Sequence, residues 1–257
     1  MRNEKVKLAR ALLSSKGRTR QKLFLIEGLR IIREAIGAGV KPRFVFYTEA
    51  FKGKGEGSLL LETLLAEGVP CYAVSQAIMR SISSTVTPQG IVAIIPFPKF
   101  TLPEEGWMTV ILDGLQNPDN LGAILRTAAA AGVDGVITTF GSVDVYNPKA
   151  VRAAMGAHFH IPIRTGLHWH QITPFLKGKQ IILADVNGPA AYYEVDWTSP
   201  SALVLGNEAK GAREEARSLA HQVVSIPMIG NIESLNVAVA AGIIIYEALR
   251  QRTLKNT

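Results

Sequence analysis

One arginine, Arg126, combines a reactive side chain with an unusual position. It lies in LDGLQNPDNLGAILRTAAAAG (residues 112–132), where it is the only charge beyond the first turn of a predicted helix. A helical side chain leans back over the preceding turn, and Gly122, four residues earlier, has no side chain to obstruct it. Arg126 can therefore reach toward the helix N-terminus near Asn120 and attract an anion there. A surface arginine on an amphipathic helix is the alternative. Asp119 or Asn120 is expected to cap the helix.

A second group of polar residues follows a strand in ALVLGNEAKGAREE, residues 202–215. The apolar run reaches Gly206, Asn207 and Glu208 come next, and Gly211 precedes a predicted helix. In an open α/β sheet, ligands bind beyond the carboxyl ends of the strands. These side chains are thus candidates for a binding site, although a purely structural turn explains this stretch equally well by itself.

The third stretch is IPMIGNIESLNVAVAAGIIIYEALRQR, residues 226–252, in which a strand end leads into a polar loop. The helix that follows is apolar on nearly every side. Ser234 is expected to cap this helix, which leaves Asn231, Glu233 and Asn236 unexplained. Because a core helix does not need so polar an entrance, the loop is a candidate binding site.

Several common catalytic motifs are absent from the sequence. It contains no G-x-x-x-x-G-K-[ST] phosphate loop, no G-x-G-x-x-G after a strand and no G-x-S-x-G elbow. Two pairs of histidines, His158 with His160 and His168 with His170, have the spacing that places side chains on one face of a strand. Without nearby cysteines or an acidic third ligand, we expect packing or surface histidines and no metal site.

The composition is that of a globular protein. Of the 257 residues, 47% are hydrophobic and 19% are charged. The apolar run at 238–245 is too short to span a membrane, and charged residues rather than an apolar signal core follow Met1. The single cysteine, Cys71, excludes an internal disulfide. We therefore expect a cytoplasmic protein with no membrane partner.

The positive charge is concentrated at the N-terminus. Residues 1–22 contain eight Lys or Arg and one acid, so the entire net charge of +7 lies there. Such an arm attracts nucleic-acid phosphates. A solvated terminus is the alternative. The candidate RNA contacts are Arg10, Lys16, Arg18, Arg20 and Lys22.

The elements that must position these residues alternate between strand and helix along the whole chain. Residues 1–96 predict a small α/β domain, with a polar connector at 14–22 and a loop at 51–58. Residues 97–107 are rich in proline and predict a linker. Residues 108–257 show the alternation typical of a parallel sheet.

Taken together, the three turns resemble those of a known family. N-P-D-N-L-G-A-I-L-R-T, L-G-N-E-A-K-G and S-I-P-M-x-G-x-x-E-S-L-N-V-A-V-A are similar, in order and spacing, to three motifs of the SpoU/TrmH branch of the SPOUT RNA methyltransferases. The match covers residues 109–252. In the first domain, F-L-I-E-G-L-R-I-I-x-E-A resembles the substrate-binding domain of rRNA-modifying members.

The resemblance implies a fold and an activity. The fold is α/β. It comprises a C-terminal SPOUT domain, which contains a parallel sheet and whose chain forms a trefoil knot, and a smaller N-terminal RNA-binding domain. The activity is transfer of a methyl group from S-adenosylmethionine to a ribose 2'-hydroxyl, without a metal. The resemblance also implies a homodimer with the last helix in its interface.

The resemblance further assigns roles to individual residues. Arg126 would be the principal catalytic residue, with Asn120, Glu208, Ser234 and Asn236 around it. The cofactor would be held largely by backbone groups at Leu205, Gly206, Asn207, Ile226, Met228, Ser234 and Leu235. A guanidinium stays protonated, so we expect Arg126 to orient an RNA phosphate and stabilise the developing oxyanion. The proton would leave through that phosphate or through Glu208.

The RNA itself is less closely defined. A whole N-terminal domain, rather than a short helix, favours rRNA over tRNA, and 23S rRNA is the expected substrate. A tRNA ribose 2'-O-methyltransferase, a base-nitrogen methyltransferase and a non-catalytic RNA-binding assembly factor remain the alternatives.

Overall fold

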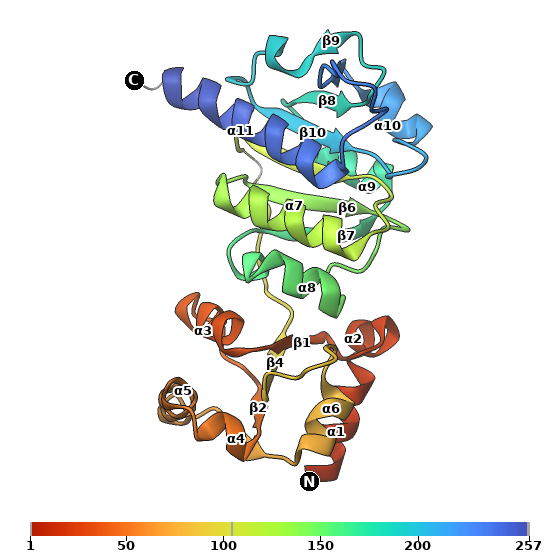
Figure 1. Ribbon diagram of the computed structural model, residues 1–257. Coiled ribbons are helices and arrows are strands. Elements are labelled where there is room, and N and C mark those ends of the chain that lie inside the picture. The colour runs from red at the N-terminus through yellow and green to blue at the C-terminus, as the bar shows by residue number, and fades with distance from the viewer. Residues whose placement is uncertain (1, 104, 256–257) are drawn as a thin grey trace. The chain divides into compact units, whose positions relative to one another are not determined.

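The computed structural model describes residues 2–103 and 105–255, which form two compact units (Figure 1). The first unit comprises the chain up to Lys99 together with Tyr146–Phe159, and the second comprises Phe100–Val145 and the chain from His160 onward. Tyr146–Phe159 lies within residues 108–257, which the sequence predicts as one C-terminal domain. This segment belongs to the first unit because the Tyr146 ring stacks on Phe97, with 3.8 Å between ring centroids, and also packs on Phe24.

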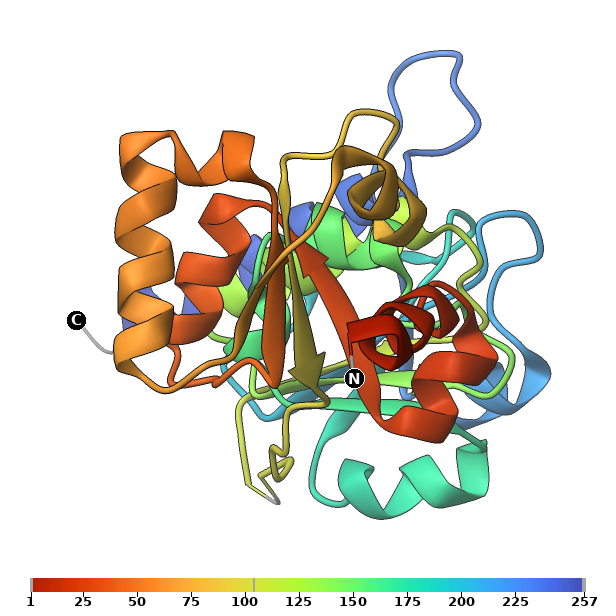
Figure 2. The same cartoon turned by 90° about the horizontal axis from the view of Figure 1, so that it is seen from below.

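The first unit is built on a four-stranded sheet of order β1-β4-β2-β3, in which β4 is antiparallel to β1 and β2 and β3 is parallel to β2. Helices α3 and α5 cover one face of this sheet and α1 and α6 the other (Figure 2). The strands are β1 (Leu23–Glu27), β2 (Phe44–Tyr47), β3 (Cys71–Ala73) and β4 (Ile91–Pro96). The helices are α1 (Arg2–Ala11), α2 (Ser15–Gln21), α3 (Leu29–Gly37), α4 (Glu49–Lys52), α5 (Gly55–Ala66), α6 (Gln76–Ile82), α8 (Pro148–Ala154) and the 3-10 turn η1 (Ala157–Phe159).

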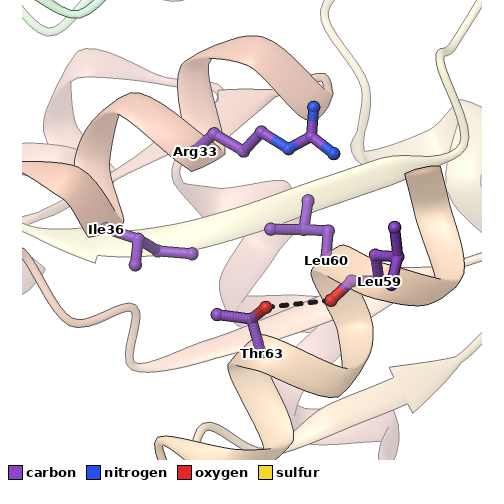
Figure 3. A pocket seen from close by; sticks show the side chains of 5 residues that line it. All are labelled: Arg33, Ile36, Leu59, Leu60 and Thr63. Carbon is purple, nitrogen blue, oxygen red and sulfur yellow. Dashed lines mark hydrogen bonds between the residues drawn. The ribbon is translucent and has the colours of Figure 1, made fainter.

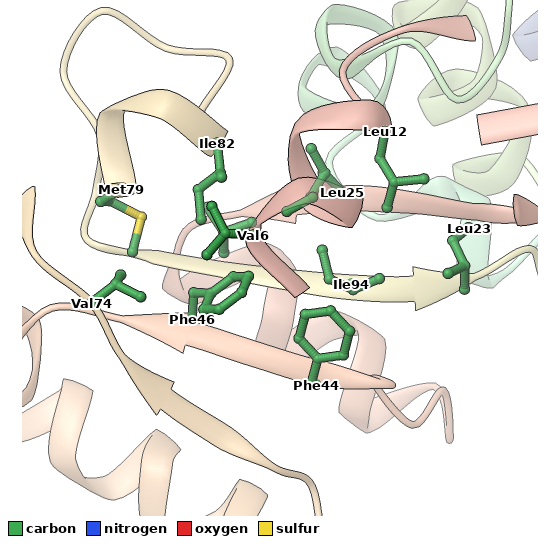
Figure 4. Packing of buried hydrophobic residues seen from close by; sticks show 12 residues of the cluster. Val6, Leu12, Leu23, Leu25, Phe44, Phe46, Val74, Met79, Ile82 and Ile94 are labelled. Atoms are coloured by element: carbon green, nitrogen blue, oxygen red, sulfur yellow. The ribbon is translucent and has the colours of Figure 1, made fainter. Parts of the chain in front are cut away.

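One apolar cluster holds α1 and α6 against the sheet (Figure 4). Val6 and Leu12 come from the α1 side, Met79 and Ile82 from α6, and Phe46 from the strand beneath them. All are at least 95% buried. Because side chains alternate between the faces of a strand, Leu23 and Leu25 join this cluster while Phe24 points to the other face, where it meets Tyr146. The basic helix α1 is thus fixed to the unit through its apolar face.

The predicted connector at 14–22 is a helix, α2, and one of its basic residues is buried. Ser14 caps α2 by accepting a hydrogen bond from the Gly17 N–H at 3.1 Å. Arg18 is only 2% exposed, and its Nη1 donates to the carbonyl oxygens of Leu12 and Leu13, both at 2.9 Å. The prediction of Arg18 as an RNA contact is therefore wrong: its charge satisfies the carbonyl groups that follow α1. The predicted loop at 51–58 likewise contains the end of α4 and the start of α5.

Replacing Arg18 by alanine is expected to destabilise the first unit by about 2–3 kcal/mol, because two carbonyl oxygens lose a charged donor. Urea unfolding followed by circular dichroism measures this change. Arg20→Ala, on the same helix with an exposed side chain, is the matched control and should leave the unfolding midpoint unchanged. Equal midpoints for the two variants would show that Arg18 has no structural role.

The second unit is built on a seven-stranded sheet of order β7-β6-β5-β10-β8-β11-β9, and each neighbouring pair is parallel. The central strands are buried from end to end, as expected for a sheet covered on both faces. The strands are β5 (Met108–Leu112), β6 (Gly135–Thr139), β7 (Ile163–Leu167), β8 (Gln180–Ala184), β9 (Ala190–Ala191), β10 (Ser201–Leu205) and β11 (Gln222–Ser225). The helices are α7 (Pro118–Ala130), α9 (Trp169–Ile172), α10 (Glu214–Leu219), α11 (Val237–Lys255) and the 3-10 turns η2 (Thr173–Leu176) and η3 (Tyr192–Glu194).

This architecture confirms the α/β class and the parallel sheet. In Figure 1, α7 and α11 lie side by side on one face of the second sheet, where they contact each other. Among the described residues, no helix has the length and apolar character needed to cross a membrane.

Candidate active site

Two of the predicted turns are neighbours because their strands are neighbours. β5 and β10 pair in register, with Leu112 opposite Leu205, so the chain leaves both strands at the same edge of the sheet. Glu208 then reaches from the second turn to the start of α7. Its Oε2 accepts the Gln116 N–H at 3.2 Å, and its Oε1 accepts the Asn117 N–H at 3.1 Å.

The third turn joins the first two through a pair of asparagines. Asn120 Nδ2 donates to Glu208 Oε1 at 3.1 Å, and Asn120 Oδ1 accepts Asn236 Nδ2 at 2.9 Å. The structure therefore brings Asn120, Glu208 and Asn236 into one hydrogen-bonded chain. These residues are distant in the sequence, and each belongs to a different motif.

The helix caps differ from the predicted ones. Asn236, not Ser234, caps α11, since its Oδ1 accepts the N–H groups of Ala238 at 2.9 Å and Val239 at 3.4 Å. Asn117 rather than Asp119 or Asn120 caps α7, with Pro118 in the first turn. A proline has no N–H to lose at a helix start, so it favours a cap immediately before it. Because Asn120 does not cap α7, its side chain is available for the hydrogen bonds with Glu208 and Asn236.

The hydrogen bonds that Glu208 accepts stabilise the ionised form of its carboxyl group. Partial burial would raise the pKa of the Glu208 carboxyl, but the hydrogen bonds from the Asn120 side chain and from backbone N–H groups, including those of Gln116 and Asn117, outweigh it. The net effect lowers the pKa below its ordinary value. Glu208 is thus an ionised acceptor that ties the turns together.

The pH dependence of stability should carry a contribution from Glu208. A lowered pKa in the folded protein means that the stabilisation is fully present above the ordinary glutamate value of 4.5 and is lost as the pH falls through the lower folded value. Glu208→Gln should therefore be less stable than the parent near neutral pH, and this difference should shrink in acid. Thermal unfolding across this range measures it, with Glu233→Gln on the neighbouring loop as the control. A difference that stays constant with pH would contradict the assignment.

The turn after β10 is closed on itself. The Asn207 and Gly211 backbones exchange hydrogen bonds at 3.0 and 2.9 Å. Asn207 Oδ1 accepts the Ala209 and Lys210 N–H groups at 3.0 Å, and Nδ2 donates to the Gly114 carbonyl at 2.8 Å. The side chain of Asn207 is thus used within the protein and closes the turn.

Two residues that the sequence analysis did not single out, Asp113 and Arg213, support this turn. Asp113 is fully buried at the end of β5, and its Oδ2 accepts the Arg213 N–H at 2.8 Å. The Arg213 Nε lies 3.7 Å from Asp113 Oδ1, and its Nη2 donates to the Phe140 carbonyl at 2.7 Å. An aspartate directly after a buried apolar strand was the available signal, because a buried carboxylate needs a partner.

The remaining predicted residues lie outside this network. Arg126 is exposed on α7, and within the described part of the chain its guanidinium has no hydrogen bond or ion pair. Ser234 and Met228 are exposed on the loop between β11 and α11, while Ile226 and Leu235 are half-buried. The structure thus leaves Arg126 as an uncompensated cation on the helix that starts at the Glu208 contacts.

The histidine pairs are not strand pairs. His158 lies in η1, and His168 and His170 lie at α9, with ring centroids 5.7 Å apart. No group of three or more potential metal-ligating side chains occurs among the residues that the structure describes.

A shallow hollow in the first unit lies between α3 and α5 (Figure 3). Leu59, Leu60 and Ile36 form most of its lining, the Thr63 hydroxyl is bonded to the Leu59 carbonyl, and Arg33 pairs with Glu56. Because the Thr63 hydroxyl and the Arg33 guanidinium are both bonded to protein partners, this hollow lacks the converging polar groups of a ligand site.

Comparison with known proteins covers nearly the whole chain. Residues 107–246 match the SpoU rRNA Methylase family, and residues 3–93 match the MRM3-like substrate binding domain. The chain is 33% identical over 247 residues to a 23S rRNA (guanosine(2553)-2'-O)-methyltransferase of Bacillus subtilis, covering 95% of this chain and 96% of that protein. It is 32% identical over 263 residues to a 23S rRNA (uridine(2479)-2'-O)-methyltransferase of Streptomyces viridochromogenes, covering 98% and 91%.

A solved structure shows the same fold. The SpoU methyltransferase AviRb from Streptomyces viridochromogenes, in complex with the cofactor AdoMet, superimposes with a TM-score of 0.87 at 30% identity, covering 97% of this chain and 98% of that one. The three motifs that meet at Glu208, Asn120 and Asn236 all fall within the matched region. The chain belongs to the SpoU rRNA methylase family.

Proposed function

We propose that this protein transfers a methyl group from S-adenosylmethionine to the 2'-hydroxyl of a ribose in 23S rRNA. The observation that carries the proposal is the hydrogen-bonded chain Glu208–Asn120–Asn236, which joins the three family motifs into one site, with Arg126 exposed on the same helix as Asn120. The names of the relatives from Bacillus subtilis and Streptomyces viridochromogenes support 23S rRNA over tRNA.

The turns that end β10 and β11 are the proposed cofactor site. Leu205 is only 2% exposed and the Asn207 side chain is engaged internally, so the first turn would bind through its backbone groups. A Cβ on Gly206 would lie 2.3 Å from the Ala212 nitrogen, so only glycine allows this close turn. From the other side the ligand would meet the loop that carries Ile226, Met228, Ser234 and Leu235. S-adenosylmethionine supplies an electrophilic methyl group on its sulfonium.

Arg126 is the proposed catalytic residue. Its guanidinium stays protonated, so it would orient the RNA phosphate next to the target ribose and stabilise the oxyanion that develops on the 2'-oxygen. The ribose hydroxyl is a weak nucleophile until it loses its proton. Glu208 is poorly suited to take that proton, since its pKa is lowered and both of its oxygens already accept hydrogen bonds. A phosphodiester is a weaker base still, so neither group would remove the proton in advance. The proton would leave, through the phosphate or through Glu208, as the 2'-oxygen bonds to the methyl carbon and the sulfonium departs as a thioether.

The first domain is the proposed RNA-binding part. We assign residues 1–96 to substrate binding, 97–107 to a linker and 108–257 to the methyltransferase domain with its trefoil knot, of which the segment Tyr146–Phe159 packs with the first unit. Four exposed cations on or beside α1 and α2 would contact phosphates: Arg10, Lys16, Arg20 and Lys22. Such contacts give affinity and position the RNA but do not read its bases.

We also propose a cytoplasmic homodimer. On α11, Ala241, Ile244 and Ile245 face the interior of the unit, whereas Val239 and Tyr246 are 51% and 49% exposed. The loop before this helix exposes Ile229 and Ile232 as well. Burying these residues against a second copy would remove apolar surface from water.

The test is methyl transfer from radiolabelled S-adenosylmethionine to 23S rRNA and tRNA from a strain that lacks the gene. Label in 23S rRNA at a position resistant to alkaline cleavage is the expected result, because a 2'-O-methyl group removes the nucleophile of that cleavage. Label in an alkali-sensitive position would indicate base methylation. Label in tRNA alone would overturn the choice of rRNA, and cofactor binding without any transfer would favour a binding protein.

A further inference from the structure

An aromatic stack lies exposed at the same edge of the second sheet as the proposed active site. The Phe140 ring lies 4.7 Å from the His168 ring at an angle of 20°, and the His168 ring lies 5.7 Å from that of His170 at 10°. Phe140 follows β6 directly and is 58% exposed, although Thr139 before it is fully buried. Both histidines are exposed as well. The three rings are nearly parallel and together present an aromatic surface to solvent.

The stack is held in place by its backbone. The Phe140 N–H donates to the Leu167 carbonyl at 2.8 Å, and its own carbonyl accepts Arg213 Nη2 at 2.7 Å. Trp169, between the two histidines, is only 7% exposed and belongs to the core cluster. The buried Trp169 anchors α9, so His168 and His170 are left on its outer side. The exposure of Phe140 is therefore a fixed feature of the fold.

Hydrogen bonds connect the stack to the active-site turns. The Gly141 carbonyl accepts Gln116 Nε2 at 2.7 Å, and the Gln116 N–H donates to Glu208 Oε2 at 3.2 Å. The Arg213 side chain lies along the same backbone and is 40% exposed. An aromatic face beside a cation therefore stands next to the turns that would hold the reacting ribose.

We propose that Phe140, with His168 and His170 behind it, stacks against an unpaired nucleobase of the RNA substrate and so helps to place the target nucleotide. The inference rests on the proposed function and adds a substrate-positioning site to it. Unpaired bases stack on Phe and His rings and on Arg planes, and a base offers the same flat π surface as these rings. The site is sequence-tolerant, because stacking reads the face of a base and not its edges.

The test is the KM for 23S rRNA from the deletion strain, measured for four proteins. Phe140→Ala is expected to raise this KM roughly tenfold, the usual effect of losing one base–aromatic stack. The kcat and the Kd for S-adenosylmethionine should stay within about twofold, since the substitution keeps the Phe140 backbone and with it the hydrogen bond from Arg213. Phe140→Tyr keeps the ring and should behave as the parent. Tyr193→Ala is the matched control: Tyr193 is 53% exposed and follows β9, the strand at the far end of the strand order from β6 and β7.

A second measurement tests the stack directly. A short single-stranded RNA that carries 2-aminopurine should lose fluorescence on binding the parent and Phe140→Tyr, but much less with Phe140→Ala, because stacking quenches this base. An unchanged KM together with unchanged quenching in Phe140→Ala would overturn the proposal. So would dissociation of a dimer by Phe140→Ala in sedimentation, because a second copy of the chain would then cover the ring. If the parent methylates no RNA, the proposed function fails, and the quenching experiment still decides whether a base stacks on Phe140.

Discussion

Replacing Arg126 by alanine is expected to lower the rate of methyl transfer by roughly 10²–10³-fold, the usual cost of removing one oxyanion-stabilising group. The structure shows Arg126 exposed on α7, and among the described residues nothing pairs with its charge. Its charge is therefore available to an RNA phosphate. Single-turnover methylation of 23S rRNA measures the rate, and calorimetry measures the Kd for S-adenosylmethionine, which should change little.

Two further variants separate the role of Arg126 from a general effect of charge. Arg126→Lys keeps the positive charge but loses the planar fork that binds a phosphate through two hydrogen bonds, so its rate should lie between those of the parent and Arg126→Ala. Arg164→Ala, on the edge strand β7, removes an equally exposed arginine and should leave the rate unchanged. Loss of cofactor binding in Arg126→Ala would remove the catalytic assignment.

Replacing Gly206 by alanine is expected to abolish detectable cofactor binding or weaken it at least about tenfold. An added Cβ would lie 2.3 Å from the Ala212 nitrogen and 2.4 Å from the Gly211 carbonyl carbon. Both atoms belong to the backbone and cannot rotate away, so the turn must move. That movement would strain the Asn207–Gly114 and Glu208–Gln116 hydrogen bonds. Overpacking of this kind costs about 1–3 kcal/mol.

The measurements for this variant are the Kd for S-adenosylmethionine by calorimetry and the free energy of unfolding in urea. Gly37→Ala is the matched control, because no atom lies within 4 Å of the Cβ that it adds. It should leave the Kd unchanged and should not lower the free energy of unfolding, because Gly37 lies in α3 and alanine is a better helix former than glycine. A Gly206→Ala protein that is destabilised yet binds the cofactor with parental affinity would place the cofactor away from this turn.

Much of the architecture could be predicted because it depends on local patterns. The alternation of strands and helices predicted an α/β fold and a parallel sheet, and the structure confirms both. The predictions were wrong where a contact between residues distant in sequence decides the local structure. Residues 14–22 are polar enough to look like a connector, but α2 forms because Arg18 finds the carbonyl groups of Leu12 and Leu13 in a buried place. Polarity alone does not show whether a charged side chain has such a partner.

The caps show the same limit on a smaller scale. Several residues near each helix start can accept a backbone hydrogen bond, so Asn117 and Asn120, or Ser234 and Asn236, were equally acceptable by type. The choice depends on what else each side chain contacts. Asn120 bridges Glu208 and Asn236, so the cap of α7 falls to Asn117. This division of roles exists only when the three turns are side by side.

The sequence by itself determined the family, the three motifs and the types of side chain available for methyl transfer, because these follow from residue type and spacing. Only the tertiary structure decided which of these residues are buried, which are paired and which remain available to a ligand. It buried Arg18, left Arg126 uncompensated and made Glu208 an acceptor of three hydrogen bonds rather than a free base. It also placed Phe140 in an exposed stack with His168 and His170. The physical reason is that burial, pKa and ring stacking depend on neighbours in space, and strand order, not sequence order, brings those neighbours together.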